Sequence, residues 1–178
     1  MSITITINRA PVLTLWAAVV AERLGFDRDE ALSLGRAVAG LNAHSKGRRL
    51  GIFKPHEEKL KEARSRSHGE VLRVEVCGLD ISATNTEDGI RAVQRGEAID
   101  PEAVEHYLED KFGDDLKAVR TAMAKPAKSY SPKEIADEAY PLYERFRPTA
   151  PEGKKGWGAK GILDLELIGG LKKPKRGR

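Results

Sequence analysis

The chain has 178 residues, of which 40% are hydrophobic and 33% are charged. This is enough apolar material for one domain with a strongly charged surface. The single cysteine excludes an internal disulfide framework and a cysteine-rich zinc module, so we expect a cytoplasmic protein. The net charge of +4 is compatible with an anionic partner.

The N-terminal part predicts a strand followed by two helices. Isoleucines alternate with polar residues over residues 3–7, which is typical of a strand with one buried face. Apolar residues then follow helical spacing until Gly25, which is expected to end the helix. Asp27-Arg28-Asp29-Glu30 resembles a capping box and starts a second helix. Small residues at positions 31, 35, 39 and 43 predict a tightly packed αα-hairpin.

Two other interpretations of this region are a DNA-binding helix-turn-helix and a membrane or signal segment. Residues 20–34 also have helix-turn-helix spacing, but Asp29 and Glu30 would repel phosphates at the start of the second helix, so we favour a structural hairpin. The apolar stretch 10–21 is shorter than the about 20 residues of a spanning helix. It could form the apolar region of a signal peptide, but only one charge, Arg9, precedes it, so we expect neither a membrane partner nor export.

The middle of the chain predicts a surface helix, a hairpin and another helix. The charged helix covers about residues 55–67. A strand over 71–77 returns over 80–84 through a type II′ turn at Gly78-Leu79. Thr86 is then expected to cap a short helix that Gly96 ends.

The C-terminal half predicts three helices, a loop and a late strand. Helices begin at Asp100-Pro101, at Asp114 and at Ser131-Pro132, where a cap is followed by helix-forming residues. Residues 149–161 form a loop, 162–168 a strand, and 171–178 a disordered basic tail. The predicted fold is therefore α+β: one helix-rich domain over residues 1–170, with an N-terminal αα-hairpin and a small, mostly antiparallel sheet.

Charge is segregated along the chain. Residues 46–66 carry eight bases and three acids, residues 74–122 carry 12 acids and five bases, and residues 154–178 carry eight bases and two acids. This pattern is typical either of a basic surface for nucleic acid beside an acidic lobe, or of opposite charges that neutralise each other within the fold or across a dimer.

Three basic segments are candidate nucleic-acid sites. Lys46, Arg48 and Arg49 flank a glycine and could bind phosphate, or they could be solvated cations at a helix end. Lys154, Lys155 and Lys160 surround Trp157, which could stack on bases or could fold back into the core. The tail could screen phosphates or serve only solubility; its basic residues are Lys172, Lys173, Lys175, Arg176 and Arg178.

No catalytic, cofactor or metal motif is present in the sequence. The histidines have neither His-x-x-x-His spacing nor a Cys-x-x-Cys partner, so no metal is predicted. Cys77 lies in a predicted strand and is interpreted as a structural thiol, because a nucleophile needs a base beside it. No cofactor is expected.

The segment from Asn8 to Phe53 resembles a family of small bacterial proteins. The resemblance rests on residues 9–16 (RAPVLTLW) and on 37–42 (AVAGLN) through Lys46-Gly47, with 155–161 (KGWGAKG) in the C-terminal part. It covers most of the chain except the basic tail. It implies a bacterial cytoplasmic protein and a single compact unit, and it implies no activity, cofactor or binding residue.

The sequence therefore favours a non-enzymatic protein that binds DNA or RNA with little sequence preference. The alternative is a protein-interaction or scaffold module whose acidic and basic surfaces meet partner chains, including a second copy of itself. A third possibility is an enzyme whose site is assembled in space without a linear motif.

Overall fold

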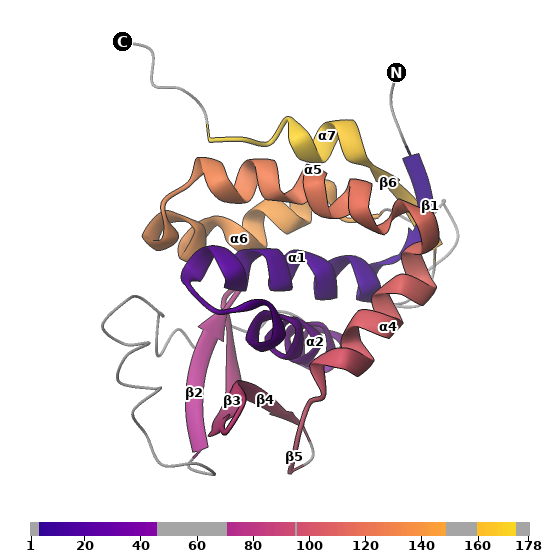
Figure 1. The fold of residues 1–178 in the computed structure, drawn as a ribbon. Coiled ribbons are helices and arrows are strands. Elements are labelled where there is room, and N and C mark those ends of the chain that lie inside the picture. The colour runs from indigo at the N-terminus through magenta and orange to yellow at the C-terminus, as the bar shows by residue number, and fades with distance from the viewer. Residues whose placement is uncertain (1–3, 46–70, 95, 149–159, 174–178) are drawn as a thin grey trace.

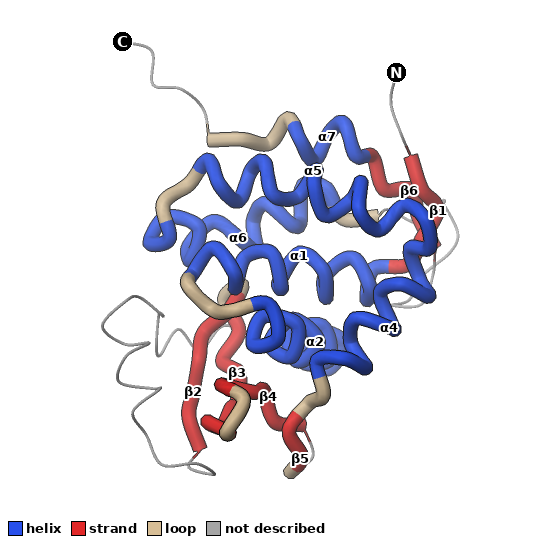
Figure 2. Tube along the Cα trace, viewed as in Figure 1, coloured by secondary structure: helices blue, strands red, loops and turns tan. Residues whose placement is uncertain are grey.

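The computed structural model describes residues 4–45, 71–94, 96–148 and 160–173. The fold is α+β and rich in helix (Figures 1 and 2). The elements in chain order are β1 (Thr4–Asn8), α1 (Arg9–Leu24), α2 (Arg28–Ser45), β2 (Val71–Val76), β3 (Leu79–Thr86), β4 (Gly89–Gln94), β5 (Glu97–Ala98), α4 (Pro101–Phe112), the short 3₁₀ turn η1 (Gly113–Asp115), α5 (Leu116–Ser129), α6 (Pro132–Phe146), β6 (Lys160–Asp164) and α7 (Leu165–Gly169).

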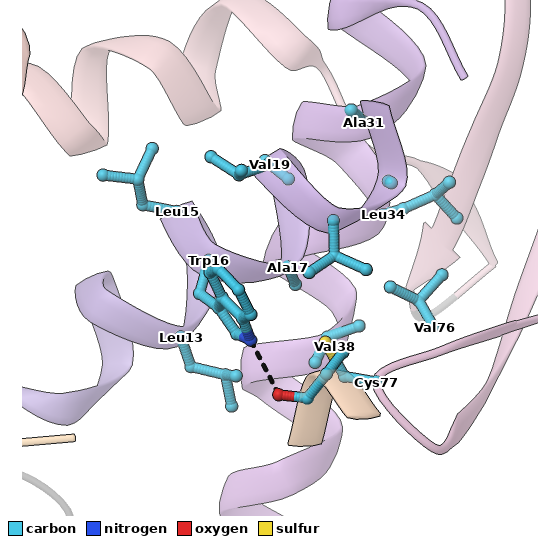
Figure 3. Packing of buried hydrophobic residues seen from close by; sticks show 14 of the residues in the cluster. Leu13, Leu15, Trp16, Ala17, Val19, Ala31, Leu34, Val38, Val76 and Cys77 are labelled. Carbon is cyan, nitrogen blue, oxygen red and sulfur yellow. Dashed lines mark hydrogen bonds between the residues drawn. The ribbon is translucent and has the colours of Figure 1, made fainter. Parts of the chain in front are cut away.

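Helix α1 lies in the middle of the molecule. Helices α5, α6 and α7 lie on one side of it, and α2 and the β2–β5 sheet lie on the other (Figure 1). Residues 11–21 of α1 are all buried. The indole of Trp16 donates a hydrogen bond from Nε1 to the carbonyl of Ala139, at 2.9 Å (Figure 3), and its ring meets Phe146 edge to face at 5.2 Å. Trp16 thus joins α1 to α6 through both apolar and polar contacts.

The predicted αα-hairpin is confirmed. Gly25 ends α1 with a φ of 115°, which favours glycine. Asp27 and Glu30 form the predicted capping box: the Asp27 carboxylate accepts from the Glu30 amide at 2.8 Å, and the Glu30 carboxylate accepts from the Asp27 amide at 2.9 Å. A Cβ on Gly35 would lie 2.4 Å from the carbonyl oxygen of Thr14, so the two backbones meet along the stripe of small residues.

The middle of the second helix of this hairpin, residues 31–39, is enclosed by the protein. Residues 31–39 are buried except Arg36, which is half-buried, because α1, β3, β4 and α4 all contact α2. A recognition helix must present one face to the major groove. The geometry therefore favours the structural hairpin over a DNA-reading helix-turn-helix.

The strands form two antiparallel sheets. Strands β1 and β6 pair with Ile5 opposite Leu163, which joins the beginning of the described chain to its end. The second sheet has the order β2-β3-β4-β5. The turn between β2 and β3 consists of Cys77 and Gly78, with φ values of 52° and 78°. Positive φ at both positions is typical of type I′, so the predicted type II′ turn at Gly78-Leu79 is wrong.

The helix predicted from Thr86 to Gly96 is also wrong, because this segment forms β4 and β5. The Thr86 hydroxyl accepts from the Asp88 amide and donates to the Gly89 carbonyl, so it closes a hairpin turn. Gly89 has a φ of 118°, which the segment reaches because glycine has no Cβ. The turn consists of residues 87 and 88, and Gly89 directly after it supplies the positive φ that a hairpin needs here. This signal outweighs the capping potential of Thr86.

Helix α2 closes part of the edge of β4. The Ile90 amide donates to Glu30 Oε2 at 2.9 Å, and the Ala92 amide donates to Ser33 Oγ at 3.0 Å. Glu30 and Ser33 are both buried. Two amides of the strand are thus satisfied by side chains of a helix, which prevents this edge from pairing with another chain.

The late strand is shorter than predicted. It ends at Asp164, whose carboxylate accepts from the Glu166 and Leu167 amides and begins α7. Leu165 and Ile168 are buried at helical spacing. The alternating leucines that predicted a strand through residue 168 therefore do not distinguish a strand from this short helix. Leu171 is also buried, and the folded chain therefore continues past the boundary predicted at 170.

All three helices predicted in the C-terminal half are present, but only two of the three predicted caps are confirmed. The predicted Asp114 cap is wrong, because Asp114 lies inside η1 and α5 begins at Leu116 without a side-chain cap hydrogen bond. The carboxylate of Asp100 accepts from the Glu102 amide at the start of α4, and Ser131 and Glu134 form a capping box at the start of α6. The predicted charged helix at 55–67 and most of the predicted 149–161 loop lie outside the described residues.

Candidate nucleic-acid interface and acidic groove

Most residues predicted to bind nucleic acid lie outside the part of the chain that the structure describes. They are Lys46, Arg48, Arg49, Lys154, Lys155, Trp157, Lys175, Arg176 and Arg178. The nucleic-acid-binding role of these residues stays a prediction.

The other three predicted residues are placed by the fold. Lys160 is the first residue of β6, and its backbone is opposite Asn8 of β1. Lys172 is exposed. The Lys173 amide donates to Ser129 Oγ at 2.7 Å, and its ammonium group is bonded to the Glu134 carboxylate. The beginning of the predicted tail is thus attached to the end of α5 and the beginning of α6.

This attachment brings the start of the tail close to two lysines of α5 that the sequence analysis did not single out. Lys125 lies beside α7, since a Cβ on Gly169 would be 3.5 Å from Lys125 Cδ. Lys128 precedes Ser129, which holds Lys173, and all three of Lys125, Lys128 and Lys172 are exposed. We call Lys125, Lys128 and Lys172 the C-terminal basic surface. Its helix lysines gave no signal in the sequence because neither lies in a charge run.

Lys173 contributes less free charge to this surface than the sequence predicts. The hydrogen bond from the Lys173 ammonium, followed by the one from the Ser131 amide, lowers the pKa of Glu134 to about 2. Glu134 is therefore ionised at neutral pH and balances the charge of Lys173. Its role is to hold the chain end in place. Within the described part of the chain, no ion pair involves Lys125, Lys128 or Lys172, so these three lysines carry the free charge of the surface.

A groove with a volume of about 960 Å³ lies between the start of α2, the β3–β4 turn and the β5–α4 connection. It is lined by six carboxylates and two guanidinium groups, and we call it the acidic groove. The carboxylates belong to Asp29, Asp88, Asp100, Glu102, Glu105 and Glu109, and the guanidinium groups to Arg28 and Arg91.

Both arginines of the acidic groove are engaged by the protein itself. Arg28 contacts Glu105 at 3.2 Å, and Arg120 contacts the same oxygen at 3.2 Å. Partial burial raises the pKa of Glu105, but the two arginines outweigh it and hold the pKa below its ordinary value. Arg91 is buried and donates to the carbonyls of Ile90 and Asp88. The exposed rim of the groove is therefore strongly negative.

Helix N-termini account for only some of these acids. Asp100 caps α4, and Asp29 and Glu102 lie in the first turns of their helices, where negative charge is favourable. Asp88 lies in a turn and Glu109 in the last turn of α4, so the helix dipole does not explain them. The sequence showed the acidic zone, but not that the start of α2 and the β3–β4 turn join α4 around one groove.

Cys77 is placed as a structural residue. Its side chain is buried among residues such as Val38 and Val76 (Figure 3), and this burial raises the pKa of the thiol. A nucleophilic cysteine needs a lowered pKa and access to solvent. Within the described ranges, no three His, Cys, Asp or Glu residues are grouped so that they could hold a metal ion.

Comparisons with other proteins give no assignment. The chain matches no protein-family model, no curated protein and no solved structure. Among the described residues, no helix combines the length and apolar character needed to cross a membrane.

Proposed function

We propose that this protein binds nucleic acid without enzymatic chemistry and with little sequence preference. The observation that carries the proposal is the bond between the Lys173 amide and Ser129, which starts the basic tail beside Lys128. The tail and the C-terminal basic surface would then form one continuous positive region on the folded domain.

Such a surface suits a phosphate backbone rather than a base sequence. Lysine ammonium groups neutralise phosphates and release counterions, which gives affinity that falls steeply with salt. Base edges are read by well-positioned bidentate groups such as arginine, asparagine and glutamine, and the three lysines of this surface supply only point charges. Trp157 would add sequence-tolerant stacking on unpaired bases.

The test is fluorescence anisotropy with labelled single-stranded DNA, duplex DNA and RNA at about 50 and 200 mM salt. The surface variant Lys125→Gln/Lys128→Gln/Lys172→Gln should bind more weakly and with a shallower salt dependence. For each phosphate of duplex DNA that the variant no longer neutralises, the slope of log K against log salt should decrease by about 0.9.

The matched control replaces three exposed bases elsewhere, Lys111, Lys117 and Arg145, and should bind as the wild type does. Trp157→Ala should weaken the binding of single strands more than that of duplexes. Absence of binding at low salt, or equal losses of affinity in the surface variant and the control, would refute the proposal.

A second candidate function is a protein-interaction module, which the acidic groove favours. Its exposed carboxylates exceed its engaged guanidinium groups, and a concave negative surface attracts a basic partner. This candidate predicts that a basic peptide binds in the groove.

A further inference from the structure

We propose that the acidic groove of one chain binds the C-terminal basic surface of a second copy, so that the protein self-associates head to tail. The inference rests on the second candidate function and names the partner. The two surfaces have opposite charge, and both consist of exposed side chains on the described fold.

The two surfaces lie at different ends of the molecule. Figure 1 shows β5 and the beginning of α4, which border the groove, below α1, whereas the chain end after α7 lies above α1. The basic surface is at that chain end, because Lys172 precedes the residue held by Ser129. Each surface of one chain is therefore available to the other surface of a different chain.

The charges complement each other in number and in exposure. Asp88, Glu102 and Glu109 are exposed on the groove side, and no ion pair is found for them among the described residues. The basic surface offers three exposed lysines in return. The concave shape of the groove would let it enclose cationic side chains that protrude from α5 and the chain end.

The symmetry of such an interface follows from its chemistry. An interface between two different surfaces is heterologous, so each bound copy leaves one groove and one basic surface free, and chains of copies can form. Exposed ion pairs are weak and are screened by salt. We therefore expect association that increases with protein concentration at low salt and disappears at high salt.

The experiment measures the mass of the intact protein in solution by light scattering or sedimentation, at about 50 and 200 mM salt. Two variants each remove one surface: Asp88→Asn/Glu102→Gln/Glu109→Gln for the groove, and the three-lysine surface variant described above. Each variant alone should have the mass of one chain. An equimolar mixture should form a dimer that does not grow further, because only one intact pair of surfaces remains.

The control Asp110→Asn/Asp114→Asn/Glu144→Gln removes three exposed acids that do not line the groove and should associate as the wild type does. A wild type that is monomeric at low salt, a mixture that stays monomeric, or a control that no longer associates would overturn the inference.

A labelled peptide of residues 169–178 distinguishes a failure of the head-to-tail inference from a failure of the second candidate function. If the peptide binds the wild type but not the groove variant, and the chain is nevertheless monomeric, the groove takes a basic partner other than a second copy. If the peptide does not bind and the chain is also monomeric at low salt, both the second candidate function and the head-to-tail inference fail.

Discussion

At the scale of single residues, Glu30 has two structural roles. Its two carboxylate oxygens accept from the Asp27 amide and from the Ile90 amide, so one buried side chain both begins α2 and closes the edge of β4. A Cβ on Gly89 would lie 3.0 Å from Glu30 Oε2, so the strand approaches the carboxylate as closely as glycine permits.

Removing this carboxylate should destabilise the fold strongly. Glu30→Ala leaves the buried Ile90 amide without its acceptor, and we expect the free energy of unfolding to fall by about 2–4 kcal/mol. Glu30→Gln keeps one oxygen and should destabilise less. Urea unfolding measures both, and Glu22→Ala, at an exposed position of α1, is the control. A decrease of less than about 0.5 kcal/mol in Glu30→Ala, the range of surface substitutions, would contradict this role.

Glu134 should make stability depend on pH in the acid range. Its pKa is lowered to about 2 in the folded chain from an ordinary value of 4.5. Because the folded pKa is the lower one, the stabilisation is fully present above about 4.5 and is lost as the pH falls towards 2. The difference in Tm between the wild type and Glu134→Gln should therefore shrink over this range. A difference that does not change between pH 6 and pH 2 would be the contrary result.

The Cys77 thiol should be unreactive in the native protein. Burial covers the sulfur and raises its pKa, and both effects suppress the thiolate that reacts with disulfide reagents. Labelling with a chromogenic disulfide should be slow in buffer and fast in denaturing urea. Fast labelling under native conditions would show that the β2–β3 turn opens.

At the scale of elements, the packing of α1 on α2 depends on Gly35. An added Cβ would meet the Thr14 carbonyl at 2.4 Å and the Ala18 amide at 3.0 Å, both of them backbone atoms that cannot rotate away. Gly35→Ala should therefore force the helices apart and cost about 1–3 kcal/mol despite the better helix propensity of alanine. Thermal unfolding measures this destabilisation.

Gly169→Ala is the matched control for Gly35→Ala. Its Cβ would make an ordinary contact with Lys125 Cδ at 3.5 Å, so its Tm should stay close to that of the wild type. Equal effects of the two substitutions would mean that glycine flexibility, rather than the close helix approach, determines the result at Gly35.

The sequence predicted those elements whose local signals agree with one another. The start of α6 is an example, because Ser131, Pro132 and Glu134 all favour a helix start and the structure contains the complete capping box. It failed at β4, where the predicted Thr86 cap competed with Asp88-Gly89. The deciding acceptors for that strand, on Glu30 and Ser33, are about 60 residues away in the chain.

The candidate surfaces were predicted less completely than the elements. The acidic zone was visible as composition, but the groove is formed by elements that meet only in the folded chain. Likewise, the tail was recognised as basic, whereas its attachment depends on Ser129 and Glu134. Ser129 is the last residue of α5, and Glu134 belongs to the capping box of α6; neither position indicates a distant partner. Side-chain contacts across long separations leave no periodic signal in a sequence.

At the scale of the whole molecule, the pairing of β1 with β6 connects both ends of the described chain, and the buried hydrophobic residues form one cluster that includes residues of both sheets. Units that share one core unfold together. We therefore expect a single cooperative transition, with coincident curves from far-UV circular dichroism and from tryptophan fluorescence.

The fluorescence measurement needs a single tryptophan, which the Trp157→Phe background provides. The remaining Trp16 is fully buried on α1 and is bonded to α6. Leu163→Ala removes a buried side chain of β6 and should shift both curves to lower denaturant by the same amount, because weaker end-to-end pairing destabilises the common core. Ile162→Ala, at a position that is 62% exposed, should shift neither. If Leu163→Ala moved the dichroism curve alone, the terminal sheet would unfold separately from the Trp16 core, and residues 1–170 would not be one domain.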